Sequence, residues 1–168
     1  MRVKALVLFV VTLALAASAW ASTETILYNF CSQSSCTDGY VPLGSLVADS
    51  SGNHLFGTTY QGGANNLGEV FELTNSGGTW TQTVLYSFTG VNNNDGQNPY
   101  AGLILDSAGN LYGTTLYGGP NNQGTVFQLS KSGSTWTETV LHAFQDISGS
   151  DGYYRSCLQK ASSGKAHS

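Results

Sequence analysis

Short apolar segments separated by polar turns dominate the chain from residue 44 onward. In EVFELT, at 69–74, and in WTQTVLYSF, at 80–88, β-branched and aromatic residues predominate. Gly, Asn, Asp and Ser stand between the segments, and no window repeats apolar residues with the 3.6-residue period of a helix. The pattern predicts β-strands at 44–49, 55–59, 69–74 and 80–88.

The same pattern of segments then occurs a second time along the chain. Matching segments lie at 101–106, 111–115, 125–130 and 136–144. The related stretches ILYNF, VLYSF and VLHAF begin at Ile26, Val84 and Val140, which are 58 and then 56 residues apart. An Asp-Gly pair follows each of them, at Asp38, Asp95 and Asp151. Because these marks keep one order, the sequence is a tandem repeat of about 56 residues.

The pattern within each repeat predicts one four-stranded antiparallel sheet that is apolar on both faces. Phe71 and Leu73 point to one face of their strand and Val70 points to the other. This is typical of a blade packed between neighbours, and propeller blades have periods of about 40 to 50 residues. We therefore expect an all-β fold of two four-stranded antiparallel β-propeller-like blades plus partial repeats. Two blades do not close a ring, so the fold is expected to be open, and its free edges favour self-association.

The first two strands of each repeat are joined by a tight hairpin, LVADSSGNHLFGTT in one copy and LILDSAGNLYGTT in the other. Asp49 or Asp106 can accept backbone hydrogen bonds, and the Gly-Asn pair readily adopts positive φ. The first copy has one additional residue, His54, which predicts a bulge beside the turn. A calcium loop is the alternative interpretation, but the further acidic ligands and closing Glu of such loops are missing.

The N-terminal segment has the features of a signal peptide. Arg2 and Lys4 precede an apolar run, and the small residues Ala19 and Ala21 have the spacing that signal peptidase recognises. The run is shorter than the roughly 20 residues of a membrane-spanning helix, which is the alternative interpretation. We expect residues 1–21 to be removed before Ser22, and the mature chain to be secreted, periplasmic or at the cell surface.

The remaining chain divides into a repeat domain and a tail. The expected domain covers 22–154, with repeat 1 at about 38–88, repeat 2 at about 95–144 and a partial third repeat at about 145–154. The tail at 155–168 has no strand pattern and is expected to be disordered. Because the third copy breaks off near Tyr154, we hypothesise a truncated reading frame or gene.

Composition narrows the classes of partner. Charged residues make up 10% of the chain and the formal net charge is −4. A nucleic-acid-binding surface needs clustered Lys and Arg, and no basic stripe is present in the sequence. We expect no nucleic-acid partner and no membrane span after signal cleavage.

The chain contains three cysteines. Cys31 and Cys36 bracket the short loop CSQSSC, and in an oxidising compartment this spacing predicts a local disulfide. A metal site is the alternative, but neither a His nor a second Cys pair lies nearby, so no metal and no cofactor is predicted. Cys157 is left without an assigned role.

The strand order predicts that the longer loops gather at one end of the molecule. In antiparallel sheets, the loop after the second strand lies at the same end as the connection between repeats, and long loops commonly carry binding residues. An extracellular glycan or a protein is the expected partner at this end. The candidate contacts are Asp38, Asp95, Asn65, Asn66, Asn121, Asn122, Tyr60, Tyr100 and Tyr117. The same residue types also build ordinary turns, and the Asp-Gly position in every copy favours that structural role.

Signals for catalysis are weak. Glu69 and Glu72 fall on opposite faces of a strand, so they do not form a cooperating carboxylate pair. No Ser lies in a nucleophile elbow and no Ser, His and Asp set indicates a triad. The expected function is a non-catalytic extracellular binding or scaffold module. The alternatives are a fragment of a larger propeller hydrolase or lyase and a truncated product without independent function.

The stretch DGQNPYAGLILDSAGNLYGTTLYGGPNNQGTVFQLSKSG, with TVLHAF after it, resembles a bacterial extracellular tandem repeat family nicknamed GloVer. The likeness runs from about Thr25 to Tyr154. It implies a secreted array of propeller-like repeats without an established activity.

Overall fold

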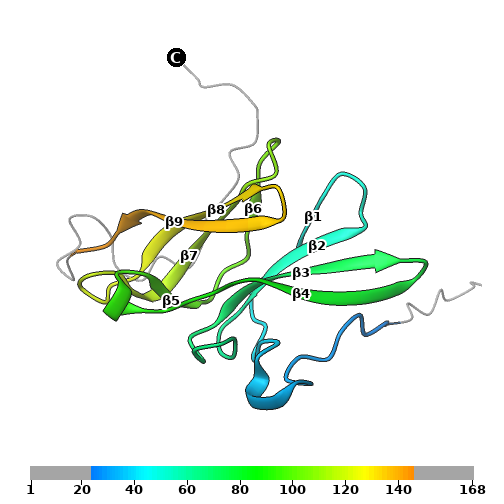
Figure 1. The fold of residues 1–168 in the computed structure, drawn as a ribbon, viewed down its shortest axis with the longest axis horizontal. Coiled ribbons are helices and arrows are strands. Elements are labelled where there is room, and N and C mark those ends of the chain that lie inside the picture. Colours follow the sequence, from blue (N-terminus) through cyan, green and yellow to red (C-terminus); the bar gives the residue numbers. More distant parts are fainter. Residues whose placement is uncertain (1–23, 146–168) are drawn as a thin grey trace, which may run out of the picture.

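The computed structural model describes residues 24–145 as two antiparallel β-sheets that follow one another along the chain (Figure 1). The first sheet has the order β1-β2-β3-β4. Its strands are β1 (Val47–Ala48), β2 (His54–Thr59), β3 (Glu69–Ser76) and β4 (Thr79–Ser87). The described residues contain no α-helix, so the predicted all-β, open architecture is confirmed.

The second sheet contains five strands where the repeat pattern predicts four. They are β5 (Gly96–Pro99), β6 (Ile104–Leu105), β7 (Leu111–Gly118), β8 (Thr125–Ser132) and β9 (Thr135–Ala143). Both β5 and β6 pair with β7, which makes them two parts of one interrupted first strand. In the first sheet, the isolated bridge between Tyr40 and Gln61 stands where β5 pairs in the second.

The predicted hairpins are present, and aspartates hold them. Asp106 accepts hydrogen bonds from the backbone N–H groups of Ala108 and Asn110, both at 2.8 Å. Asp49 accepts from the backbone N–H of His54 at 3.3 Å. These contacts close each turn in the way the Asp-x-x-Gly-Asn spacing predicts.

The bulge expected at His54 is absent from the pairing of β1 with β2. The backbone N–H of Asp49 bonds to the carbonyl of His54, whereas that of Asp106 bonds to Asn110, so the extra residue lengthens the turn itself. A longer turn preserves the register, and a one-residue slip would turn every side chain of the strand over. Register shifts occur instead in the pairing of the third strand with the fourth, between Val70 and Phe71 and between Val126 and Phe127.

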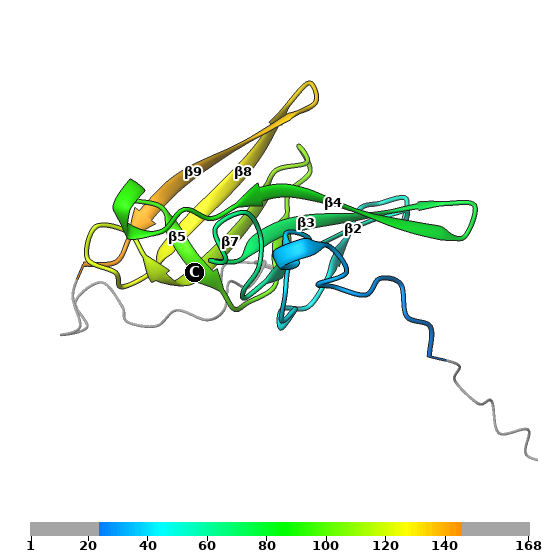
Figure 2. The ribbon, with the colours of Figure 1, turned by 60° about the horizontal axis from the view of Figure 1, so that its bottom comes forward.

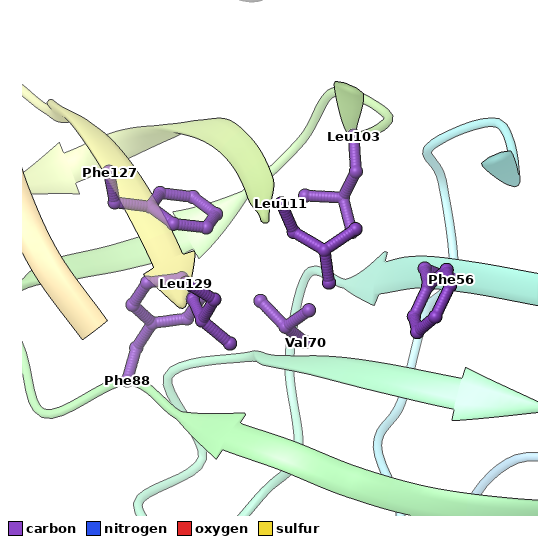
Figure 3. Close-up of a cluster of buried hydrophobic side chains, with 7 residues drawn as sticks. All are labelled: Phe56, Val70, Phe88, Leu103, Leu111, Phe127 and Leu129. Atoms are coloured by element: carbon purple, nitrogen blue, oxygen red, sulfur yellow. The ribbon is translucent and has the colours of Figure 1, made fainter. Parts of the chain in front are cut away.

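One hydrophobic core lies between the two sheets (Figure 3). Phe56 and Val70 come from the first sheet and face Leu103, Leu111, Phe127 and Leu129 of the second, with Phe88 from the connection between them. The Phe88 and Phe127 rings meet edge to face with their centroids 5.1 Å apart. Burial of these side chains holds the two sheets together.

An equivalent contact between two phenylalanine rings is found where the chain enters the first sheet. Phe30, in the segment before η1 (Ser34–Cys36), meets Phe71 edge to face at 4.8 Å, as Phe88 meets Phe127. A Cβ on Gly57 would lie 2.6 Å from Phe71 Cζ, so glycine allows the ring to lie against the strand. Figure 2 shows this entering segment, in blue, beside β2 and β3.

Candidate functional site

The longer loops meet at one end of the molecule, as the strand order predicts. The loop between β2 and β3 is tied to the N-terminal loop by a hydrogen bond from Gly63 N–H to the Cys36 carbonyl at 3.0 Å. It is tied to β5 of the second sheet by a bond from Asn98 N–H to the Leu67 carbonyl at 2.7 Å. We call this region the loop end.

Asp38 lies fully buried in the first connecting loop. Its carboxylate accepts hydrogen bonds from the Tyr28 hydroxyl at 2.8 Å, from the Ser32 backbone and hydroxyl at 2.9 and 2.7 Å, and from Gln33 N–H at 3.2 Å. Burial opposes ionisation, but the bonds from Ser32, Tyr28 and Gln33 outweigh it and lower the pKa of Asp38 to about 2. The aspartate therefore acts as an ionised anchor for its own loop.

Asp95 repeats this arrangement in the second connection. It accepts from the Tyr86 hydroxyl at 2.8 Å and from the Thr89 backbone and hydroxyl at 2.7 and 2.9 Å. The Gly96 N–H adds a bond at 2.6 Å. To reach Asp38 or Asp95, a ligand would have to displace hydrogen bonds that the loops make themselves.

The candidate asparagines lie on the exposed turns after β2 and β7. Asn66 and Asn122 both have φ 55° and accept hydrogen bonds from Gly62 N–H at 3.1 Å and Gly118 N–H at 2.9 Å. Asn65 donates from its side chain to the Phe88 carbonyl at 3.0 Å, and Asn121 is exposed. Three of the four amides therefore shape or fasten the loops.

The structure brings two candidate tyrosines from different repeats together. Tyr60 follows β2, Tyr100 follows β5, and their rings meet edge to face with centroids 6.4 Å apart. Tyr100 is 49% exposed. Tyr117 lies within β7, paired with Gln97. A comparison of repeat with repeat does not reveal the Tyr60–Tyr100 contact, because Tyr60 aligns with Leu116 in the second copy.

A second group of carboxyls lies beside the anchors, and the sequence did not reveal it as a group. Glu69 is fully buried; its Oε1 accepts from the Gln82 side chain at 3.1 Å, and its Oε2 accepts no hydrogen bond within the described residues. Burial, with the nearby Asp38 carboxylate, raises the pKa of Glu69 to about 8. Glu138 is half-buried near Asp95, and burial followed by the Asp95 charge raises its pKa to about 7.

These two acids come from different strands of the two repeats, β3 for Glu69 and β9 for Glu138. Glu69 corresponds to Thr125, and Gln82 corresponds to Glu138. In the first repeat, Glu69 accepts a hydrogen bond from the Gln82 side-chain amide. In the second repeat, the Thr125 hydroxyl is instead hydrogen-bonded to the Thr115 hydroxyl at 2.8 Å. Each anchor aspartate thus has one glutamate near it, supplied by a different strand.

The structure contains a disulfide between Cys31 and Cys36 in the first connecting loop. Cys157, Asp151 and the tail lie outside the described residues. Between residues 24 and 145, no three His, Cys, Asp or Glu side chains are grouped as metal ligands. That stretch also forms no helix with the length and hydropathy of a membrane span.

The comparison with family models gives one assignment. The Gloeobacter/Verrucomicrobia repeat model matches residues 10–166. No curated protein and no solved structure is significantly similar to the chain. The matched range covers both sheets and their shared core, and the chain belongs to the Gloeobacter/Verrucomicrobia repeat family.

Proposed function

We propose that this chain is an exported, non-catalytic binding or scaffold module built from propeller-like sheets. The observation that carries the proposal is the use of polar groups at the loop end: Asp38 and Asp95 are buried and bonded to their own loops. A general acid or base must instead come within hydrogen-bond reach of a substrate. The loop end is therefore a fixed surface that presents side chains and does not transform a ligand.

The exposed ligand surface in this proposal centres on Tyr60 and Tyr100. An aromatic pair with exposed amides nearby suits the apolar faces and hydroxyls of an extracellular glycan, or the side chains of a protein. Asn121 supplies an exposed amide on the same end.

A binding screen combined with activity assays tests this function. The mature chain is applied to glycan and peptide arrays, and the bound polysaccharides are then assayed for hydrolysis and elimination. We expect binding without turnover. Binding should weaken when Tyr60→Leu and Tyr100→Leu are combined, because Leu116 and Leu43 hold the corresponding positions in the other repeat. Val91→Ala, at an exposed apolar residue of the same end, is the matched control and should bind normally.

A specific observation keeps the enzymatic alternative in view. Burial raises the pKa of Glu69 to about 8 and keeps it protonated at neutral pH, as a general acid must be, but a substrate would reach this fully buried carboxyl only if the loop end opened. Turnover of a polysaccharide that Glu69→Gln abolishes would contradict the binding-module proposal and favour a fragment of a propeller hydrolase or lyase.

Export is the second part of the proposal. The support is the basic, apolar and small-residue order of residues 1–21. N-terminal sequencing of the protein recovered outside the cytoplasm should begin at Ser22. Recovery of the protein solely in the cytoplasm, with Met1 or Arg2 at its start, would contradict export.

A further inference from the structure

We propose that a cleft between the two sheets, at the end opposite the loop end, binds a neutral oligosaccharide. The β3–β4 and β8–β9 hairpins diverge from the shared core toward their turns (Figure 2). Between them lies a cleft of about 660 Å³, and an adjoining hollow of about 230 Å³ shares three of its lining residues. The shared residues are Glu72, Lys131 and Trp136. The main cleft falls within the usual size range of small-molecule sites, about 300 to 1,000 Å³.

Trp136 gives the cleft a fixed aromatic wall. Its ring meets the edge of the core residue Phe56 at a centroid distance of 6.3 Å, so the core holds the indole in place. Lys131 Nζ lies over the same ring, 5.5 Å from its centre. The part of the indole that faces the cleft is suited to pack against the C–H face of a sugar ring.

The polar groups of the cleft carry both signs of charge. The His54 imidazole Nδ1 lies 2.6 Å from Glu72 Oε1, and the Glu72 side chain is 15% exposed. Asp49 lines the adjoining hollow together with these two residues and Lys131. Carboxylates accept hydrogen bonds and the ammonium donates them, so hydroxyls, which do both, match this lining. The mixture of signs favours an uncharged polyol over a polyanion or a polycation.

The charged residues of the cleft are those in which the repeats differ, whereas Trp136 has a counterpart in Trp80. Glu72 corresponds to Gln128 and Lys131 corresponds to Asn75, while His54 is the additional residue of the first hairpin. Both copies form the same hairpins without sharing these side chains, so the common fold does not require them. A ligand accounts for their position on the two walls of one cleft.

The test measures binding of the mature full chain to maltohexaose, cellohexaose, xylohexaose and N-acetylchitohexaose. In the Trp80→Phe variant, Trp136 becomes the sole tryptophan after Ser22, and its fluorescence reports on the cleft directly. We expect at least one probe to shift that fluorescence in a saturable way. Glu72→Gln with Lys131→Asn should then weaken affinity by about tenfold or more, the scale of a lost charged hydrogen bond. These two substitutions copy the other repeat, so they should leave the fold intact.

Trp80→Ala is the matched control, because Trp80 holds the position of Trp136 in the first repeat. It should bind with unchanged affinity, whereas Trp136→Ala should lose binding. The cleft assignment is overturned if none of the four probes binds, or if binding survives Trp136→Ala. If every probe that binds depends on Tyr60 and Tyr100 and keeps its affinity in Trp136→Ala, the cleft assignment is overturned while the loop-end proposal is supported. The two proposals therefore fail by different results.

Discussion

At the residue scale, burial gives carboxyls of one chain opposite protonation states. Asp38 remains ionised because its loop donates several hydrogen bonds to it, whereas Glu69 lies beside that charge and one of its oxygens accepts no hydrogen bond from residues 24–145. The pKa of the first falls to about 2 and that of the second rises to about 8. Hydrogen bonding decides the first case and desolvation decides the second.

These shifts predict that the protein is most stable in mildly acidic solution. Below the ordinary pKa of Asp38, 3.8, its depressed folded-state value means that stability is lost as pH falls toward about 2. For Glu69 the sign is reversed. The unfolded chain ionises near pH 4.5 while the folded chain keeps the proton up to about pH 8, so stability falls as pH rises through that window.

Thermal unfolding of the wild type and of Glu69→Gln, followed by circular dichroism between pH 4 and 9, checks this expectation. The variant should lose less stability than the wild type between pH 4.5 and pH 8. Glu72→Gln serves as the control, because Glu72 is a partly exposed acid three residues further along β3. Parallel pH profiles for the wild type and Glu69→Gln would contradict the burial of a protonated Glu69.

The anchor aspartates make a second prediction. Asp95→Ala leaves the Tyr86 hydroxyl and the Thr89 N–H without their acceptor, so we expect a loss of about 2 to 3 kcal/mol of unfolding free energy. Urea denaturation measures the loss. Asp106→Ala, at a more exposed hairpin turn, should cost less, and equal losses in the two variants would contradict the anchoring role of Asp95.

At the element scale, the hydrophobic pattern predicted the three longer strands of each repeat well, but the first strands predicted at 44–49 and 101–106 are shorter, as β1 (Val47–Ala48) and β6 (Ile104–Leu105). The predicted strand 69–74 lies within β3, and 80–88 covers nearly all of β4. Strand β5 was not predicted, because residues 96–99 lie in a stretch rich in Asn, Gly and Pro that is typical of a loop between the repeats. The position of the extra residue in the first turn depends on the register of β1 with β2, which local sequence does not set.

The candidate sites were likewise predictable from the sequence only in part. The repeat predicted which end carries the longer loops, since strand order alone determines it. It did not predict the contact of Tyr60 with Tyr100 or the facing of Glu72 with Trp136, because these residues come from different repeats and meet through the packing of one sheet on another. Aligning the copies with each other hides such pairs.

Close packing of an aromatic ring on a glycine gives a prediction for β7. A Cβ on Gly113 would overlap the ring of Phe127 and would lie 2.9 Å from Leu103 Cδ2. Gly113→Ala should therefore cost about 1 to 3 kcal/mol through overpacking of the core. Chemical denaturation measures the cost, with Ser107→Ala in the exposed hairpin as a control. A stability equal to that of the wild type would show that the ring does not rest on this strand.

At the scale of the whole molecule, the two sheets share one core and should unfold together. Phe88 is fully buried between them and contacts Phe127. Phe88→Ala should cost about 3 to 5 kcal/mol, the usual range for a large aromatic removed from a core. Tryptophan fluorescence and far-ultraviolet circular dichroism should report one coincident transition in the wild type, and separate transitions would indicate that the sheets fold independently.

The shared core separates the residues that both copies need for the fold from the residues in which the copies differ. Residues that both copies need, such as Phe71 and Phe127, form the joints between layers. Residues in which the copies differ, such as Glu72 where the second copy has Gln128, line the cleft that the joint leaves open. A tandem repeat can thus keep its fold while each junction between sheets acquires its own chemistry.

The most direct measurement is methyl nuclear Overhauser spectroscopy of the mature chain, with Val and Leu methyl groups labelled. Packing of the first sheet on the second predicts cross-peaks that join Val70 to Leu111 and Leu129, residues that belong to one buried cluster (Figure 3). Cross-peaks confined within each sheet, with none between Val70 and the second sheet, would contradict the face-to-face stacking on which both the loop end and the cleft depend.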